Sequence, residues 1–472
     1  MSLGAGARAA SLACLGLFLG CDRRELQQGA PEPATTPVTP VTTAQPALSS
    51  AAPAEPSASA SPSASASVEP PSPPPPLLAK QRAPHDYAKG PFYFTPAYDG
   101  SLRFSLWLGT MAFARRMEAR HGQRPHFTFF VNGAFYTTEK VESDVGHATT
   151  RAEVLVRRAL TQQAINEGHE IGNHGMGHLD GRAFDLAGWA AELDRFHTTM
   201  DFTLFEPVTD ADGRFVFPRF EALADAPAGG TGAACKTDDD CDSRRCVALT
   251  AESSLCTEPC NLKRRCPKGT ACGAPMFRED TDLCLPPPAF PVVHEGELLF
   301  DARGNANPKS KRLRPYRIVG FRAPYLGAND ALYEALAARE YVYDTSQATS
   351  PPEPPYFLAT PSMKRPILEL ALMPHPGALA VPMDYNYRLE KGSPERMKAD
   401  YRAAIEASYG DGHRPWNVGH HFATWGEGTY LTVLEDTVEH VVAGCPDEHG
   451  ERHCPEARAV SFRELAKTTR EP

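Results

Sequence analysis

The sequence lacks a long basic run and a Cys-x2-Cys pair, and its N-terminal apolar run, residues 9–20, is too short to cross a bilayer as a mature helix. The net charge of −10 over 472 residues, with no basic cluster, argues against nucleic acid as a partner. The absence of a Cys-x2-Cys pair argues against a zinc finger, although the chain has 12 cysteines. Residues 25–80 lack aromatic side chains and therefore cannot form a packed core.

The N-terminus has the features of an export signal. Arg8 precedes the apolar run, which ends in Gly20-Cys21 and is followed at once by charged residues. A small residue before cysteine at this place resembles a bacterial lipoprotein cleavage site. We expect residues 1–21 to be the signal peptide and Cys21 to carry a lipid that anchors the protein to a membrane, facing the periplasm or the cell surface. Ordinary secretion with cleavage nearby is the alternative.

Residues 22–85 are predicted to be a disordered linker. This segment is rich in Pro, Ala, Ser and Thr, and 14 of the chain's 45 prolines lie between Pro31 and Pro76. Such a composition favours extended polyproline geometry at about 3 Å per residue. The linker's predicted role is to hold the folded part away from the membrane.

From residue 86 onward, short apolar runs alternate with amphipathic stretches. Strands are predicted at 92–95, 127–131, 169–172, 317–321, 341–343, 368–373 and 416–420, and helices at 105–120, 150–168, 184–205, 329–340, 394–409 and 429–442. The alternation predicts βα units on a parallel sheet or barrel. We therefore expect one discontinuous α/β domain over residues 86–206 and 316–465.

The break in this alternation contains most of the cysteines. Eight lie between Cys235 and Cys284, with little periodicity around them, which indicates an inserted module over residues 231–286. In an exported chain, a dense even set of cysteines predicts disulfides, here four. Cys445 and Cys454 are candidates for a fifth.

Four polar segments each follow a predicted strand, where α/β folds place their sites. They are Tyr98-Asp99-Gly100, residues 173–178 (Asn-His-Gly-Met-Gly-His), residues 321–325 (Phe-Arg-Ala-Pro-Tyr) and residues 419–422 (Gly-His-His-Phe). A His-x-x-x-His pair can direct two imidazoles at one ion, and a carboxylate completes a two-His, one-carboxylate site with open positions. By spacing alone, two histidines four apart in a Gly-rich loop are by default surface or capping residues.

The order of these segments resembles that of the NodB-type polysaccharide deacetylases, carbohydrate esterase family 4. The family's strand Ala-Thr-Phe-Phe-Val-x-Gly is similar to residues 126–133 (His-Phe-Thr-Phe-Phe-Val-Asn-Gly), and its Gly-His-Glu-Ile-Gly-Asn-His matches residues 168–174 letter for letter. The resemblance covers residues 92–205 and 316–445. It implies an irregular (β/α) barrel that removes N-acetyl groups from a glycan.

The resemblance also implies roles for single residues. Asp99, His174 and His178 match the metal ligands, with zinc or cobalt as the implied ion. His420 matches the late histidine that protonates the leaving amine, with His421 as the less favoured choice. Tyr325 matches the residue whose backbone N–H binds the oxyanion, and Arg322 the arginine that orients the catalytic base.

The sequence departs from the family at the base itself. Tyr98 occupies the position of the family's base Asp, and a neutral tyrosine is a poor base at neutral pH. Asp384 or Glu427 are alternative bases, or His420 serves both proton transfers with a metal-bound water. The remaining alternative is that the domain has lost hydrolysis and only binds sugars.

Two further residues are candidates for supporting roles. Asp344 resembles a residue after a middle strand in some relatives, and is equally compatible with a cap. Trp425 has the side chain to stack on a sugar ring or to be buried. The sequence thus predicts a monomeric, exported, metal-dependent deacetylase of a polysaccharide such as peptidoglycan, chitin-like chains or an exopolysaccharide. A catalytically impaired glycan-binding protein and an amidohydrolase of small C–N substrates are the alternatives.

Overall fold

The computed structural model describes residues 78–148, 150–273 and 281–471, which lie within one compact unit. The expected signal peptide, Cys21 and nearly all of the expected linker lie outside the described residues. No helix in the described part is both long and apolar enough to cross a membrane.

A nine-stranded sheet forms the centre of the domain, in the order β1-β15-β16-β14-β13-β5-β4-β3-β18. The seven strands from β16 to β18 are mutually parallel, and β15 and β1 are antiparallel additions at one edge. The strands are β1 (Ala79–Arg82), β3 (Ala97–Asp99), β4 (Thr128–Val131), β5 (Glu170–Asn173), β13 (Gly320–Phe321), β14 (Tyr343–Asp344), β15 (Tyr356–Ala359), β16 (Ile367–Glu369) and β18 (His420–His421).

The sheet curls until its ends approach one another. The segment after β16 meets the segment before β18, where Asn417 Nδ2 donates to the Ala371 carbonyl over 3.0 Å and Trp416 Nε1 to that of Met373 over 3.1 Å. A second small sheet continues from there: β17 (Trp416–Asn417), β2 (Tyr93–Thr95) and β19 (Arg458–Ala459). The predicted irregular (β/α) barrel is confirmed.

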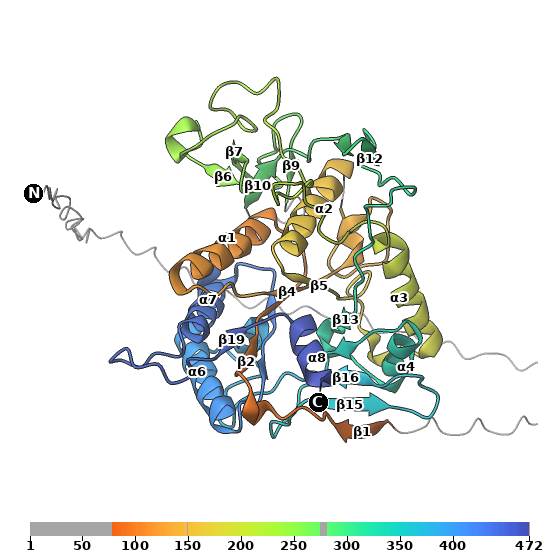
Figure 1. Cartoon of the computed structure of the whole chain (residues 1–472), viewed down its shortest axis with the longest axis vertical. Helices are drawn as coiled ribbons and strands as arrows, with labels where there is room; N and C mark the ends of the chain where they lie inside the picture. The colour runs from red at the N-terminus through yellow and green to blue at the C-terminus, as the bar shows by residue number, and fades with distance from the viewer. Residues whose placement is uncertain (1–77, 149, 274–280, 472) are drawn as a thin grey trace, which may run out of the picture. The chain divides into compact units, whose positions relative to one another are not determined.

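Amphipathic helices cover the outside of the sheet (Figure 1). They are α1 (Phe104–His121), α2 (Arg151–Asn166), α3 (Leu186–Met200), α4 (Asp330–Ala338), α5 (Asp384–Leu389), α6 (Pro394–Gly410), α7 (Thr429–Val442) and α8 (Phe462–Arg470). α8 reaches the barrel interior, where Phe462 stacks on Tyr343 at a ring distance of 5.8 Å. Its next residue, Arg463, donates its backbone N–H to the buried carboxylate of Glu170.

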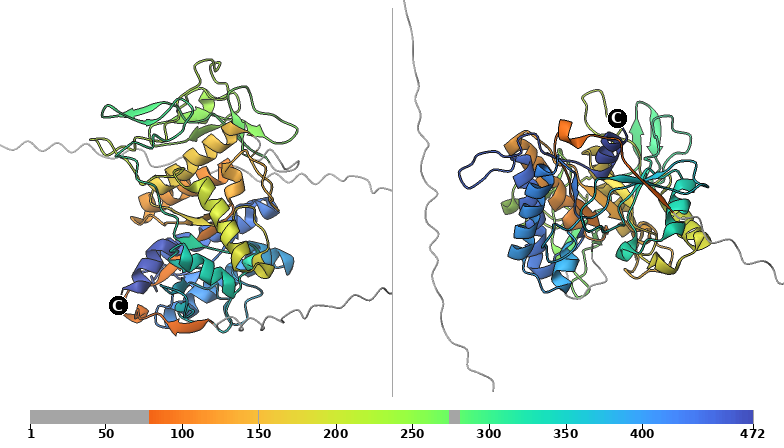
Figure 2. Two further views of the ribbon diagram at one scale, coloured as in Figure 1. Left: turned by 90° about the vertical axis from the view of Figure 1, so that its right-hand side faces the viewer. Right: turned by 90° about the horizontal axis from the view of Figure 1, so that it is seen from below.

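The cysteine-rich segment forms a small module of hairpins, at the end of the domain opposite α8 (Figure 2). Its strands are β6 (Cys246–Ala248), β7 (Ser254–Cys256), β8 (Pro259–Cys260), β9 (Ala271–Cys272) and β10 (Asp282–Leu285), followed by the hairpin β11 (Val292–His294) and β12 (Glu297–Phe300). The expected four disulfides are present: Cys235–Cys246, Cys241–Cys256, Cys260–Cys272 and Cys266–Cys284. The expected fifth joins Cys445 and Cys454.

The ordered domain extends beyond the expected boundaries at both ends. β1 begins at Ala79, inside the segment predicted to be linker, and pairs with β15. Its four residues, Ala-Lys-Gln-Arg, are all exposed, so no apolar alternation marks them as a strand. At the other end, α8 continues to Arg470, past the expected limit at 465.

Candidate metal centre and active site

A cavity of about 390 Å³ opens where the parallel strands end. Six residues singled out from the sequence line it: Asp99, His174, His178, Tyr325, His421 and Trp425. The carboxyl ends of parallel strands and the loops after them meet at one edge of a barrel, which explains why segments more than 300 residues apart converge here.

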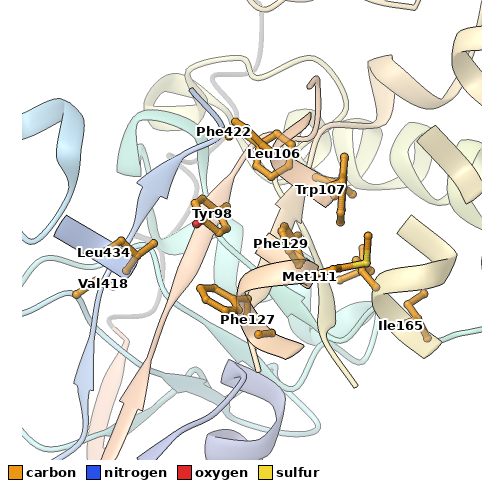
Figure 3. Close-up of a cluster of buried hydrophobic side chains, with 14 of the residues drawn as sticks. Tyr98, Leu106, Trp107, Met111, Phe127, Phe129, Ile165, Val418, Phe422 and Leu434 are labelled. Carbon is orange, nitrogen blue, oxygen red and sulfur yellow. The ribbon is translucent and has the colours of Figure 1, made fainter. Parts of the chain in front are cut away.

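Strand alternation decides which residues reach this cavity. On β3, Asp99 points to the cavity, and Tyr98 points to the opposite face of the sheet, among aromatic and aliphatic side chains (Figure 3). The Tyr98 ring lies 5.6 Å from that of Phe129 and 5.7 Å from that of Phe127. Burial raises the pKa of Tyr98 well above its ordinary value. Tyr98 therefore belongs to the core and takes no part in proton transfer at the cavity.

A buried ion pair fixes Asp99. Arg322 Nη1 donates to Asp99 Oδ1 over 2.8 Å, and both side chains are almost inaccessible. Burial alone would raise the pKa of Asp99, but the charge of Arg322 and its hydrogen bond counteract this and hold that pKa below its usual value. Asp99 is therefore an ionised carboxylate, with Oδ2 as the oxygen available to a ligand.

The two histidines of the second segment lie in a loop after β5, with ring centroids 4.9 Å apart. His174 Nδ1 lies 2.8 Å from the Arg322 carbonyl, so this nitrogen donates and Nε2 is left for a metal. His178 adopts a left-handed φ of 61°, and its buried Nδ1 has no hydrogen-bond partner in the described part of the chain. Burial lowers the pKa of both imidazoles, to about 3 for His178.

This loop is held by a residue that no sequence motif marks. Glu192, on α3, is buried, and its Oε1 accepts from the backbone N–H groups of Met176 and Gly177 over 2.7 and 3.2 Å. A lone glutamate on a predicted helix gives no sign of such a contact, because it depends on how the helix packs.

The donor chemistry of the cavity fits a divalent metal. An ionised carboxylate and two neutral imidazoles are in the protonation states that metal binding requires. However, the possible ligand atoms of Asp99, His174 and His178 do not all lie close to one another. Within the described residues, groups of three possible ligand atoms all within 4.8 Å occur only among disulfide-bonded cysteines. Binding at Asp99, His174 and His178 therefore requires a side-chain adjustment.

His421, and not His420, is the late histidine of the cavity. In the register of β18 with β3, His421 pairs with Asp99 and His420 pairs with Tyr98. His420 is buried on the core side, where its Nε2 lies 3.0 Å from the Tyr401 hydroxyl and burial lowers its pKa to about 4. The preference for His420 drawn from the sequence is thus corrected by the alternation of side chains along β18.

Asp384 orients His421. Its Oδ1 lies 2.8 Å from His421 Nδ1, and its carboxylate also accepts the backbone N–H of His421. Burial would lower the pKa of His421, but the Asp384 carboxylate outweighs it and raises that pKa above its ordinary value. Asp384 is therefore committed to the histidine, and His421 Nε2 is the nitrogen left for a substrate.

Tyr325 sits in a strained segment beside the two loop histidines. Tyr325 and Leu326 have left-handed φ values of 57° and 52°, a conformation that is uncommon without glycine and is typical of functional sites. The Tyr325 side chain is 53% exposed at the cavity mouth, and its ring lies 4.7 Å from that of His178.

Asp344 supports this segment from behind and does not line the cavity. It is buried, and its Oδ1 accepts from Ser346 Oγ, which in turn accepts the backbone N–H of Ala323 over 2.7 Å. Burial raises the pKa of Asp344 to about 6. Glu427, an alternative base in the sequence, is exposed and is not among the cavity's lining residues.

Aromatic rings border the cavity beside His421. Trp425 lies 4.9 Å from the His421 ring and 5.2 Å from the ring of Tyr385, which is 39% exposed. Tyr385 was not singled out in the sequence, because nothing in its neighbourhood marks it as facing the site.

No protein-family model and no curated protein matches the sequence. Among solved structures, a proposed polysaccharide deacetylase from Mycobacterium smegmatis is similar over 84% of this chain and 95% of its own, at 14% identity and a TM-score of 0.42. A chitin deacetylase from Colletotrichum lindemuthianum is similar over 76% and 85%, at 11% identity and a TM-score of 0.31. Puue allantoinase is similar over 80% and 89%, at 9% identity and a TM-score of 0.38.

Proposed function

We propose that this protein is a metal-dependent hydrolase that removes N-acetyl groups from a polysaccharide outside the cytoplasm. The observation that carries this proposal is the convergence of Asp99, His174 and His178 with the His421–Asp384 pair on one open cavity. Motifs that resemble those of the NodB-type deacetylases supply Asp99, His174, His178 and the His420-His421 pair.

A divalent metal, with zinc as the first choice, would be held by Asp99, His174 and His178, and would polarise the acetyl carbonyl. His421 accepts the proton of the attacking water and returns it to the departing amine, so that acetate and a free amine result. Asp384 holds the imidazole in place for both transfers. Neither Tyr98 nor Glu427 lines the cavity, and Asp384 is hydrogen-bonded to His421. The proposal therefore has His421 as the only base.

The substrate we propose is a sugar polymer. The cavity is open and is larger than an acetyl group requires, and exposed rings of Tyr385 and Tyr325 stand at its mouth. Aromatic faces beside a polar centre suit the apolar faces of pyranose rings. The proposed glycans are peptidoglycan, a chitin-like chain and an exopolysaccharide.

Five disulfides are typical of a protein that folds outside the cytoplasm. We further propose that the mature chain is a monomer held on a membrane by a lipid at Cys21. Replacing Cys21 with serine should move the protein from the membrane fraction to the soluble one, and unchanged membrane association would contradict the anchor.

Acetate release from acetylated chito-oligosaccharides and peptidoglycan, with zinc or cobalt added, tests the activity. His174→Ala should abolish release and His421→Ala should lower it by about 10²–10⁴. His449→Ala, at a side chain that is 80% exposed, serves as the matched control. A wild-type protein that binds these glycans without releasing acetate would point to the impaired, sugar-binding alternative. Release from small amides alone would point to a small-molecule amidohydrolase.

A further inference from the structure

The loop that follows Asp99 is held from two sides. Arg157, on α2, is fully buried, and its guanidinium donates to the carbonyls of Ser101 and Leu102, each over 3.0 Å. A third donor of the same group bonds to the Phe135 carbonyl over 2.8 Å. Arg157 thus ties the loop after β3 to the loop after β4.

The second hold comes from the disulfide module. The N-cap residue of α1, Arg103, supplies no side-chain cap. Instead, Asp282 of the module accepts the backbone N–H of Phe104 over 2.7 Å with Oδ2 and that of Ser105 over 2.9 Å with Oδ1. The negative charge of the carboxylate is also stabilised by the positive end of the α1 helix dipole and by the positive charge of Arg157.

Asp282 is held in place by the strands and disulfides of the module. It begins β10, the middle strand between β8 and β9, and it is 2% exposed. Disulfides Cys260–Cys272 and Cys266–Cys284 cross-link the strands around it. Because the module is cross-linked by disulfides, its carboxylate cap restrains the position of the start of α1 and of the loop before it.

We propose that Asp282 is a positioning residue for the site, through which the disulfide module fixes the loop behind Asp99. The inference rests on the proposed function, since it gives Asp99 a role at the metal. Without Asp282, two amides at the start of α1 lose their acceptor and the loop from Ser101 to Arg103 loosens. Asp99 then samples positions away from His174 and His178. No module residue within the described part lines the cavity, so substrate binding itself is not involved.

The test compares Asp282→Ala, Asp282→Asn and the control Asp239→Ala. Asp239 is an exposed module carboxylate whose ion pair with Arg244 is equally exposed. We expect Asp282→Ala to weaken zinc binding, measured by competition with a chromophoric chelator, by about tenfold, the lower end for a residue that supports metal ligands. kcat should fall by a similar factor and KM should change by less than about twofold. Asparagine also caps helices, so Asp282→Asn should keep most of both values.

Amide hydrogen exchange at Phe104 and Ser105 provides a readout that does not depend on activity. Faster exchange in Asp282→Ala, with Asp239→Ala unchanged, is the expected result. If the alanine variant does not fold, Asp282→Glu, which keeps the charge but displaces the carboxylate, is measured in its place with the same expectation. Exchange equal to wild type, or a rise in KM with kcat and zinc affinity preserved, would overturn the inference. A wild-type protein without zinc binding or acetate release would defeat the proposed function, while the exchange data would still decide whether Asp282 fixes the loop.

Discussion

Arg322 Nη1 lies 2.8 Å from Asp99 Oδ1, and neither side chain is more than 3% exposed. Removing one partner of such a pair leaves an uncompensated charge in the protein interior. We expect Arg322→Met to lower the free energy of unfolding by about 3–5 kcal/mol. Chemical denaturation measures this free energy. The control is Arg317→Met, at an exposed ion pair with Glu340, for which we expect a loss of less than about 1 kcal/mol. Similar losses for both variants would contradict the importance of the buried pair.

Tyr98 offers a direct test of whether a base is missing from β3. Replacing it with aspartate, the residue of the resembled family, should not raise activity, because position 98 faces the aromatic core. Burying an unpaired carboxylate there should cost at least about 4 kcal/mol or prevent folding. Tyr98→Phe should keep wild-type kcat and lose about 1 kcal/mol for the hydrogen bond between its hydroxyl and Thr110. Increased acetate release by Tyr98→Asp would refute this assignment.

The adjacent histidines of β18 should separate catalysis from stability. His421→Ala is expected to lower kcat by about 10²–10⁴, because a positioned acid–base group is lost, while the protein stays folded. His420→Ala should act mainly on the melting temperature, because its ring is buried against Tyr401. Kinetics and thermal melts of both variants make the comparison, and the reverse pattern would restore His420 as the catalytic residue.

His169 should make the protein less stable in mild acid. Burial lowers its pKa from an ordinary 6.5 to about 3, and its Nδ1 accepts the backbone N–H of Phe127. As the pH falls below 6.5, the unfolded chain binds a proton that the folded chain refuses, so stability declines by up to about 1.4 kcal/mol per pH unit from this group.

Substituting His169 with glutamine removes that contribution. Urea unfolding at pH 7, 6 and 5 should therefore show a shallower decline for His169→Gln than for the wild type. His449→Gln, at an exposed position, should follow the wild-type decline. Parallel curves for all three proteins would mean that His169 has the same pKa in the folded and unfolded chains.

The sequence was sufficient for the alternation of strands and helices, because most of these elements carry a buried apolar face with a clear period. It failed where that signal is absent, as in exposed β1, or where a contact depends on packing between distant elements. Glu192, Asp282 and Tyr385 belong to the second kind. The choice between His420 and His421 needed the register of β18 against β3, since a shift of one residue turns every side chain to the other face.

The pairing of β3 with β18 also means that the cavity cannot be complete until the C-terminal part of the chain is present. β3 and β18 lie side by side, yet some 320 residues separate Asp99 from His421 along the chain. Closing so long a loop costs more conformational entropy than joining nearer strands, so we expect this pair to form after them. If the chain is exported as proposed, the part that emerges first carries Asp99, His174 and His178 without His421, and the proposed activity would begin only when the last segment has emerged.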